Sequence, residues 1–400
     1  QMAQADYRYV ERFVKFLLWS VGGFRIYICG CSPLAQRLKS AYTLTGERKF
    51  DAQFMQDVYE VPMEVVDLPL EQCPKANETA RPIGGHLEGC RIGFDAGGSD
   101  RKVSAVVDGR TVYSEEVIWH PKTAADPRYH QREVLCALRT AAAHLPRVDA
   151  IGVSTAGIVR GDELMVSALL AAVPPERQQE GRTLYRRAAA AMGNVPLAVA
   201  NDGDVTALAG YMSLGTGPVM GIAMGTSQAA GYVDAQGRVS GWLNELAFAP
   251  VDLNEEAMAD EWSTDKGVGC KYFSQDAVIK LAPAAGINLS PDLSPAEKLK
   301  EVQKLMEIPG SPAEGIYRSI GVYLGHSLAL YHSFYGFKHV LLLGRVMSGK
   351  GGEAILANCQ QVLNDEYPEL AKAIRVMLPD EKTRRVGQSV AAASLPELRK

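Results

Sequence analysis

A glycine-bearing turn pattern that occurs twice is the feature of this sequence that most restricts its fold. Each copy has two glycines at the same separation followed by an arginine: Gly97, Gly109 and Arg110 in the first copy, and Gly225, Gly237 and Arg238 in the second. Apolar stretches flank the turns, and glycine tolerates the positive φ that a tight turn needs. One supersecondary unit used twice predicts a duplicated α/β fold, with two lobes and a cleft between them.

The residues that follow each copy predict how the two lobes are completed. After the first copy we expect helix 128–145, strand 150–154, helix 183–192, strand 196–200 and helix 204–214. After the second copy, whose third strand starts at Arg238, we expect helix 312–335, strand 339–343, helix 351–365, strand 373–378 and helix 387–395. These patterns predict a first lobe at residues 89–203, a second lobe at 204–386, and a C-terminal helix at 387–398 that packs back onto the first lobe.

Residues 1–88 precede the duplicated part and predict a separate α+β extension. The expected elements are helix 7–19, strand 24–29, helix 34–42 and strand 62–68, followed by a linker at 71–89 that is rich in Pro, Gly, Asn and charge. Arg8, Arg12 and Lys15 share one face of the first helix, which we interpret as a solvated face. The role of the extension stays open between a lid over the cleft and a dimer contact.

Charge and composition exclude several classes of partner. Of the 400 residues, 47% are hydrophobic and 22% charged, and the formal net charge is -4, so no basic field favours nucleic acid. No apolar stretch approaches the length of a membrane span. The seven cysteines are scattered and odd in number, which favours a reducing cytoplasm over a disulfide framework.

The two glycine turns are candidates for phosphate binding. In the first copy, Asp95 ends a strand and precedes Gly97, Gly98 and Ser99. This arrangement brings a carboxylate, suited to a hydrated Mg²⁺, together with backbone N–H groups that can approach a phosphate. Gly225-Thr226-Ser227 repeats the turn in the second copy. Each turn alone could be a plain tight turn, but a pair of them favours a polyphosphate held from both ends.

Asn201 and Asp202 lie where strand 196–200 gives way to a helix. A carboxylate at a strand end is well placed to accept a proton from a substrate hydroxyl. An ordinary helix cap explains the same residues equally well, because both types cap helices. If Asp204 takes the capping role, Asp202 is left for chemistry.

Five motifs occur together in the order and approximate spacing of the ROK family of sugar kinases and sugar-responsive regulators. They are Asp95-Ala-Gly-Gly-Ser99, Ile151-Gly-Val-Ser-Thr-Ala-Gly157, Ala200-Asn-Asp-Gly-Asp204, Met224-Gly-Thr-Ser227 and Leu342-Leu-Gly344. The chain resembles this family over about residues 90–395. The resemblance implies an α/β fold of duplicated ribonuclease-H-like lobes, as in the actin-like ATPases.

The resemblance also implies a role for each matched residue. Asp202 corresponds to the catalytic base, and Asn201 and Glu245 correspond to sugar-binding residues. The implied phosphate- and ATP-binding residues are Asp95, Gly97, Gly98, Ser99, Gly225, Thr226, Ser227, Gly344 and Arg345. Ser154, Thr155 and Gly157 would complete the substrate side. The implied cofactors are ATP and Mg²⁺, with Asp95 holding the metal through water.

The sequence departs from the family pattern at several positions. Phe248 stands where the family has a histidine that binds sugar and zinc, and Cys270 is a single thiol where the family has a cysteine-rich zinc element. One thiol cannot build a tetrahedral zinc site, so we predict no zinc. Arg345 replaces a glycine of the adenosine loop and could crowd the nucleotide or stack on it.

The leading expectation is a cytoplasmic, homodimeric enzyme that transfers a phosphoryl group from ATP to a hydroxyl of a small sugar or sugar derivative. A non-catalytic sugar sensor on the same fold is the alternative that Arg345 and the lost zinc element favour. A DNA-binding regulator is a further alternative, which the net charge and the absence of a winged-helix pattern in residues 1–85 disfavour.

Overall fold

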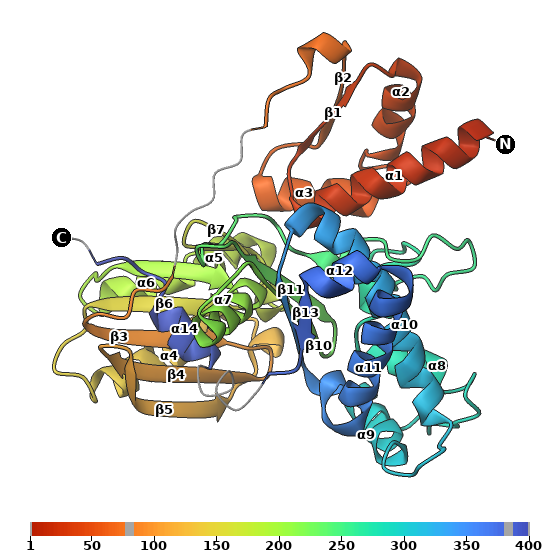
Figure 1. Ribbon diagram of the computed structural model, residues 1–400. Coiled ribbons are helices and arrows are strands. Elements are labelled where there is room, and N and C mark those ends of the chain that lie inside the picture. The colour runs from red at the N-terminus through yellow and green to blue at the C-terminus, as the bar shows by residue number, and fades with distance from the viewer. Residues whose placement is uncertain (1, 77–83, 380–386, 399–400) are drawn as a thin grey trace. The chain divides into compact units, whose positions relative to one another are not determined.

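The computed structural model describes residues 2–76, 84–379 and 387–398, and the chain forms two compact units (Figure 1). One unit, here the first lobe, comprises Ala80–Val219, Gly231–Gly241 and Pro379–Lys400. The other, here the second lobe, comprises Gln1–Thr79, Met220–Ala230 and Trp242–Leu378, so it includes the N-terminal segment. The predicted division differs from these units, because residues 204–219 belong to the first lobe. Residues 77–83 of the predicted linker lie outside the described residues.

The first lobe contains a five-stranded sheet of order β5-β4-β3-β6-β9. The strands are β3 (Cys90–Ala96), β4 (Asp100–Val107), β5 (Arg110–Ile118), β6 (Ala150–Thr155) and β9 (Leu197–Asn201). β4 runs antiparallel to both of its neighbours, whereas β3, β6 and β9 are parallel. The turn predicted at Gly109 forms between β4 and β5, with φ 77° at Gly109 and 46° at Asp108 before it. A small hairpin, β7 (Ile158–Arg160) and β8 (Glu163–Val166), and α5 (Gln178–Arg182) complete the lobe.

Alternating residues of the central strands face different helices. Ile92 and Phe94 of β3 belong to one apolar core with residues of α4 (Pro127–Ala142) and α6 (Leu184–Ala191). Between them, Gly93 lies against α14 (Gln388–Ala393), which also contacts α7 (Asp202–Leu214). This alternation is the period of two that a strand imposes on its side chains.

Two glycines allow α14 to approach the sheet closely (Figure 1). Gly93 and Gly152 are register partners on β3 and β6. A Cβ at Gly93 would lie 1.6 Å from the Ser389 carbonyl oxygen, and one at Gly152 would lie 1.7 Å from that of Ala392. No larger residue fits at either position without displacing the helix backbone.

The second lobe contains a four-stranded sheet of order β11-β10-β12-β13 and several helices. The strands are β10 (Val219–Met224), β11 (Gln228–Val233), β12 (His339–Leu343) and β13 (Arg375–Met377). The helices are α8 (Gln275–Leu281), α9 (Pro295–Leu305), α10 (Ala313–Tyr335), α11 (Gly349–Glu366) and α12 (Pro368–Ala373). α10 and α11 pack side by side (Figure 1), where Gly321 and Gly325 meet the backbone and side chains of α11.

The strand predicted from Arg238 onward is wrong. Only an isolated bridge between Val233 and Val239 forms there. The Asp234 side chain accepts from the Arg238 amide and pairs with its guanidinium, which closes the turn, and Gly241 at φ 74° then redirects the chain.

The N-terminal segment, residues 2–76, is a parallel strand pair with helices. Its elements are α1 (Met2–Ser20), β1 (Arg25–Cys29), α2 (Ser32–Ala41), α3 (Lys49–Tyr59) and β2 (Glu64–Leu68). The predicted elements are present, and α3 was not predicted. Phe16 of α1 packs on Tyr331 and Phe334 of α10, with ring centroids 5.8 and 4.8 Å apart, so α1 is attached to the second lobe by an apolar contact. Among the described residues, none of the helices has both the length and the apolar character needed to cross a bilayer.

Candidate functional site

The carboxyl ends of the parallel strands in the first lobe bring several predicted residues together. Asp95 on β3 is the register partner of Ser154 on β6, and Thr155 on β6 is the partner of Asn201 on β9. The Ser154 hydroxyl donates to Asp95 Oδ1 over 2.7 Å. Asp202 directly follows β9 as the first residue of α7. The parallel register therefore gathers both acidic residues at one edge of the sheet.

Asp202 is held at the beginning of α7 but is not its cap. Asn201 is the cap, because its side-chain oxygen accepts from the Gly203 amide over 2.8 Å. Asp202 Oδ1 accepts from the same amide over 2.9 Å. Asp204, the other possible cap, does not take this role, since its buried carboxylate accepts from the Tyr232 amide on β11.

Burial raises the pKa of Asp202 to about 7, and the negative charge of Asp95 adds to the effect. The Gly203 amide acts in the opposite direction but is outweighed. A carboxylate that titrates near neutral pH can accept a proton from a hydroxyl and later release it. The environment of Asp202 thus suits a general base.

Asp95 has the properties of a ligand for a hydrated divalent cation. Its side chain is buried, which raises its pKa, and the Ser154 hydrogen bond counteracts that shift. Oδ2 has no hydrogen-bond partner among the described residues. The negative charge of Asp95 raises the pKa of Asp202, and a divalent cation would stabilise two carboxylates placed in this way. Mg²⁺ therefore fits the residues present.

The other predicted residues of the first lobe surround these carboxylates. The side-chain amide of Asn201 donates to the Gly157 carbonyl over 2.9 Å, and the Thr155 hydroxyl bonds the buried Tyr185 hydroxyl over 2.7 Å. Asn201 and Thr155 are thereby held in place by contacts at their own strand ends. Tyr185 was missed, since nothing in its local sequence marks it as a neighbour of β6.

The first glycine turn needs glycine at position 97. A Cβ there would lie 2.8 Å from the Asp100 carbonyl oxygen, and the Gly97 carbonyl accepts from Trp119 Nε1 over 2.8 Å. At Gly98 a Cβ would meet the flexible end of Lys122, a cation that the sequence interpretation did not include. Ser99 is exposed. The turn is thus anchored by Trp119 and has a lysine beside it.

The second glycine turn and the predicted adenosine-loop glycine are neighbours within the second lobe. The Gly225 amide donates to the Ser227 carbonyl, so the exposed residues Thr226 and Ser227 form the tip of the turn. Gly344 follows β12 at φ 94°, and a Cβ there would lie 2.3 Å from the Met224 carbonyl oxygen. Arg345, next along the chain, is exposed.

The segment that leads into Glu245 is fixed by the end of α1. The Leu243 amide donates to the Val21 carbonyl over 3.2 Å, and the Asn244 amide donates to the Ser20 carbonyl over 2.9 Å. The Tyr335 hydroxyl donates to the Asn244 side-chain oxygen over 3.0 Å. The N-terminal segment therefore sets the backbone position from which Glu245 projects.

Phe248 lies in an aromatic cluster rather than beside potential metal ligands. Its ring centroid is 4.6 Å from that of Trp19, 5.4 Å from Phe50 and 5.3 Å from Trp262. Burial raises the pKa of the Cys270 thiol to about 12, and the nearby Asp260 adds to this. A protonated thiol is a poor zinc ligand, and no group of three or more metal-binding side chains occurs in residues 2–76, 84–379 and 387–398.

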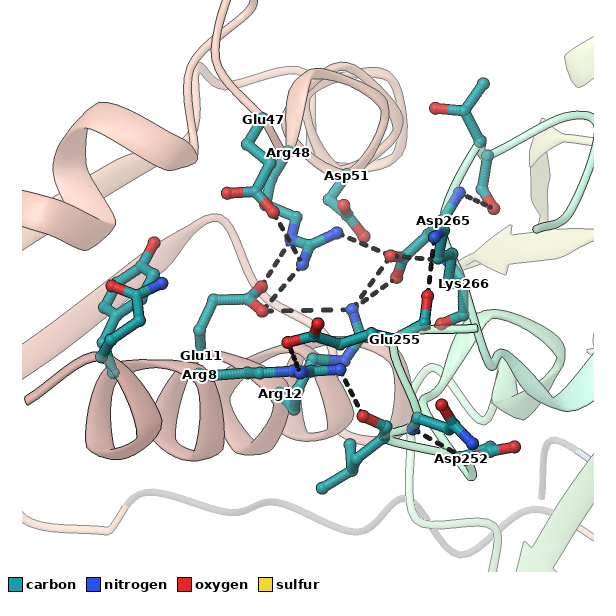
Figure 2. Close-up of a pocket in the computed structure, with 16 residues that line it drawn as sticks. Arg8, Glu11, Arg12, Glu47, Arg48, Asp51, Asp252, Glu255, Asp265 and Lys266 are labelled. Atoms are coloured by element: carbon teal, nitrogen blue, oxygen red, sulfur yellow. Dashed lines mark hydrogen bonds and ion pairs between the residues drawn. The ribbon is translucent and has the colours of Figure 1, made fainter. Parts of the chain in front are cut away.

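A cluster of ion pairs joins the N-terminal segment to residues 252–266 (Figure 2). Asp265 accepts from Arg12, Lys15 and Arg48, each at 2.8 Å. Arg48 also pairs with Glu11. Burial alone would raise the pKa of Asp265, but the three cations outweigh it and hold the pKa well below its usual range. The solvated face predicted for Arg12 and Lys15 is wrong, because only 7% and 0% of these residues is exposed.

Solved structures share this fold with the chain. A ROK family glucokinase from Streptomyces griseus, solved in complex with glucose and AMPPNP, has 18% identity and a TM-score of 0.57, and the match covers 76% of this chain and 98% of that one. A ROK hexokinase from Thermus thermophilus has 19% identity and a TM-score of 0.59, with 76% and 97% covered. A ROK family transcriptional regulator, a homolog of the E. coli MLC protein, has 16% identity and a TM-score of 0.59, with 77% and 79% covered.

Neither a family model nor a curated protein matches the sequence. At these identities the structural likeness establishes the fold. The chain has the duplicated α/β fold of ROK proteins, which confirms the fold class that the sequence motifs predicted. Sugar kinases and a transcriptional regulator both occur among the similar structures.

Proposed function

We propose that the protein is a sugar kinase, which transfers a phosphoryl group from ATP to a hydroxyl of a small sugar or sugar derivative. The observation that carries this proposal is Asp202, a half-buried carboxylate whose pKa of about 7 reflects burial and the neighbouring Asp95. The ROK glucokinase and hexokinase among the similar structures support it.

In this proposal Asp202 accepts the proton of the attacking sugar hydroxyl. Asn201 and Glu245 orient the sugar, and Ser154, Thr155 and Gly157 support the strand ends around it. Mg·ATP would supply the phosphoryl group and neutralise the developing charge. Asp95 would hold Mg²⁺ through water. The phosphates would be held by the Gly97–Ser99 and Gly225–Ser227 turns, and the adenosine would lie near Gly344 and Arg345.

The test is ATP consumption across a panel of monosaccharides and amino sugars. We expect Asp202→Asn to keep the fold and sugar binding and to lower turnover by about 10²–10⁴-fold, the usual contribution of a general base. The matched control is Asp126→Asn, the half-exposed cap of α4 outside the carboxylate pair, which should keep full activity. Undiminished turnover in Asp202→Asn removes this residue from the mechanism.

A sugar sensor without kinase activity is the second candidate, favoured by the arginine at position 345 and by the regulator among the similar structures. Thermal-shift measurements separate the two functions, because a sensor is stabilised by sugar but never by Mg·ATP. A gel-shift assay with genomic fragments tests DNA binding. The homodimer and the cytoplasmic location also stay proposals, and light scattering tests the first of them.

A further inference from the structure

A small aromatic pocket lies in the second lobe between α8, α10 and the segment 252–258. Its volume is about 190 Å³. The lining includes Asp252, Met258, Tyr272, Lys280, Leu281 and Tyr323. The Tyr272 and Tyr323 ring centroids are 4.6 Å apart, so the two phenols form one wall. With about 30 Å³ for each water in the liquid, the pocket has room for a molecule of a few heavy atoms.

Lys280 contributes an amine that lacks the usual partners of a lysine. Its Nζ lies 3.8 Å from the Tyr272 ring centroid. Within the described part of the chain it forms no hydrogen bond and no ion pair. Lys271 shows the contrast, since this buried amine pairs with Glu261 and Asp276.

Burial, rather than the surrounding charges, favours the neutral form of the Lys280 amine. Burial lowers the pKa of Lys280 to about 8, and the positive charge of Lys271 acts in the same direction. Three groups oppose the shift: Asp252, Cys270 and Asp276. Glu256 also lines the pocket.

The carboxylate of Asp252 accepts hydrogen bonds from donors other than Lys280. The Tyr272 and Tyr323 hydroxyls donate to its Oδ2 over 2.6 and 3.1 Å, and the Asn254 amide donates to Oδ1 over 2.8 Å. These bonds hold the pKa of Asp252 below its usual range although burial acts against them. The hydrogen bonds of Asp252 are therefore made without Lys280, although the charge of Lys280 also lowers the pKa of Asp252.

We propose that Lys280 is an imine-forming lysine and that its pocket takes a small aldehyde. A partly buried lysine without an ion pair is an environment in which an amine can act as a nucleophile at neutral pH. The Nζ lone pair forms a bond to the carbonyl carbon, and the carbonyl oxygen takes up a proton. The carbinolamine then loses water as the C–O bond breaks, which leaves a protonated C=N bond. One proton is consumed and one water is released, without any change of oxidation state.

The pocket provides groups suited to this sequence of steps. The Tyr272 and Tyr323 hydroxyls donate their protons to Asp252, so their oxygens can accept a hydrogen bond from the hydroxyl of the carbinolamine. Leu281 and Ile320 line the apolar side, which fits a short carbon chain. The pocket and its amine do not depend on the carboxylate pair of the first lobe, so this inference stands apart from the proposed kinase activity.

The test is reductive trapping with glycolaldehyde and sodium cyanoborohydride, applied to the full chain and followed by peptide mass spectrometry. At pH 7 an amine with a pKa near 8 is about 10% neutral, against about 0.04% for an ordinary lysine. Lower basicity also weakens the nucleophile, so we expect Lys280 to be labelled about tenfold faster than the exposed Lys304 and Lys372. The rate should saturate with aldehyde concentration and level off above about pH 8.

Two variants separate pocket chemistry from general lysine reactivity. Lys280→Arg should abolish labelling of that peptide and leave Lys304 and Lys372 unchanged. Tyr323→Phe removes one hydroxyl but keeps the ring, and it should slow labelling at Lys280 alone. The proposal is overturned if Lys280 reacts no faster than the exposed lysines, or if its rate keeps rising to pH 10 without saturation.

Discussion

The ion-pair cluster on Asp265 allows a sharp test of what the N-terminal segment contributes. Asp265 lies in the segment 252–266 and accepts from Arg12 and Arg48, as Figure 2 shows. It also accepts from Lys15. Only 9% of its side chain is exposed. Asp265→Asn preserves the shape of the side chain but leaves these cations with one carboxylate fewer. Breaking a buried ion pair in this way typically costs about 3–5 kcal/mol.

The expected consequence is a looser attachment of α1 to the second lobe. Because the Leu243 and Asn244 amides donate to carbonyls at the end of α1, their protection reports on that attachment. Hydrogen exchange followed by mass spectrometry should show these amides exchanging at least about a hundredfold faster in Asp265→Asn, which corresponds to about 3 kcal/mol.

A conservative change on the same segment provides the control. Glu255→Gln removes a carboxylate whose side chain is 80% exposed and which pairs with Arg8. An exposed pair contributes less than about 1 kcal/mol, so exchange at Leu243 and Asn244 should change by no more than about fivefold. Equal effects from the two variants, or unchanged exchange in Asp265→Asn, would refute the role assigned to the cluster.

Two further predictions concern the carboxylate pair and the glycines. The kcat/KM of the proposed kinase reaction should rise with pH to a plateau with a midpoint near 7, because Asp202 accepts a proton only when ionised. Asp95→Asn should move the midpoint of the residual activity to lower pH. An unmoved midpoint would show that the two carboxylates are not coupled. Gly344→Ala, where φ is 94° and the new Cβ would lie 2.3 Å from the Met224 carbonyl oxygen, should destabilise the protein by about 1–3 kcal/mol in urea unfolding. Gly225→Ala meets no atom closer than 3.8 Å and should cost less than about 1 kcal/mol, so equal losses would contradict this steric argument.

The features that could be predicted from the sequence are those encoded by local backbone chemistry. The repeated glycine spacing predicted the turns at Gly109 and Gly237, which have φ values of 77° and 74°. Apolar periodicity located most helices and strands. The position of Asp202 at a strand end followed from the same reasoning, since the next residues begin a helix.

The features that were missed depend on contacts between distant segments. Arg12 and Lys15 have the spacing of a solvated helix face. They are buried because both form ion pairs with Asp265, a residue about 250 positions further along the chain. Likewise, Asp204 resembles a helix cap in the sequence, but in the structure its carboxylate accepts from the Tyr232 amide on β11. Local patterns do not specify such partners.

The glycine pair at Gly93 and Gly152 has a consequence for how the first lobe can be completed during synthesis. The α14 residues that fill the groove over these glycines follow the entire second lobe in the chain. A ribosome must therefore make residues 220–378 before the first sheet can receive its last helix. Until then α14 does not cover the strip of β3 and β6 that contains Gly93 and Gly152. A nascent chain stalled before residue 388 should stay protease-sensitive at this strip.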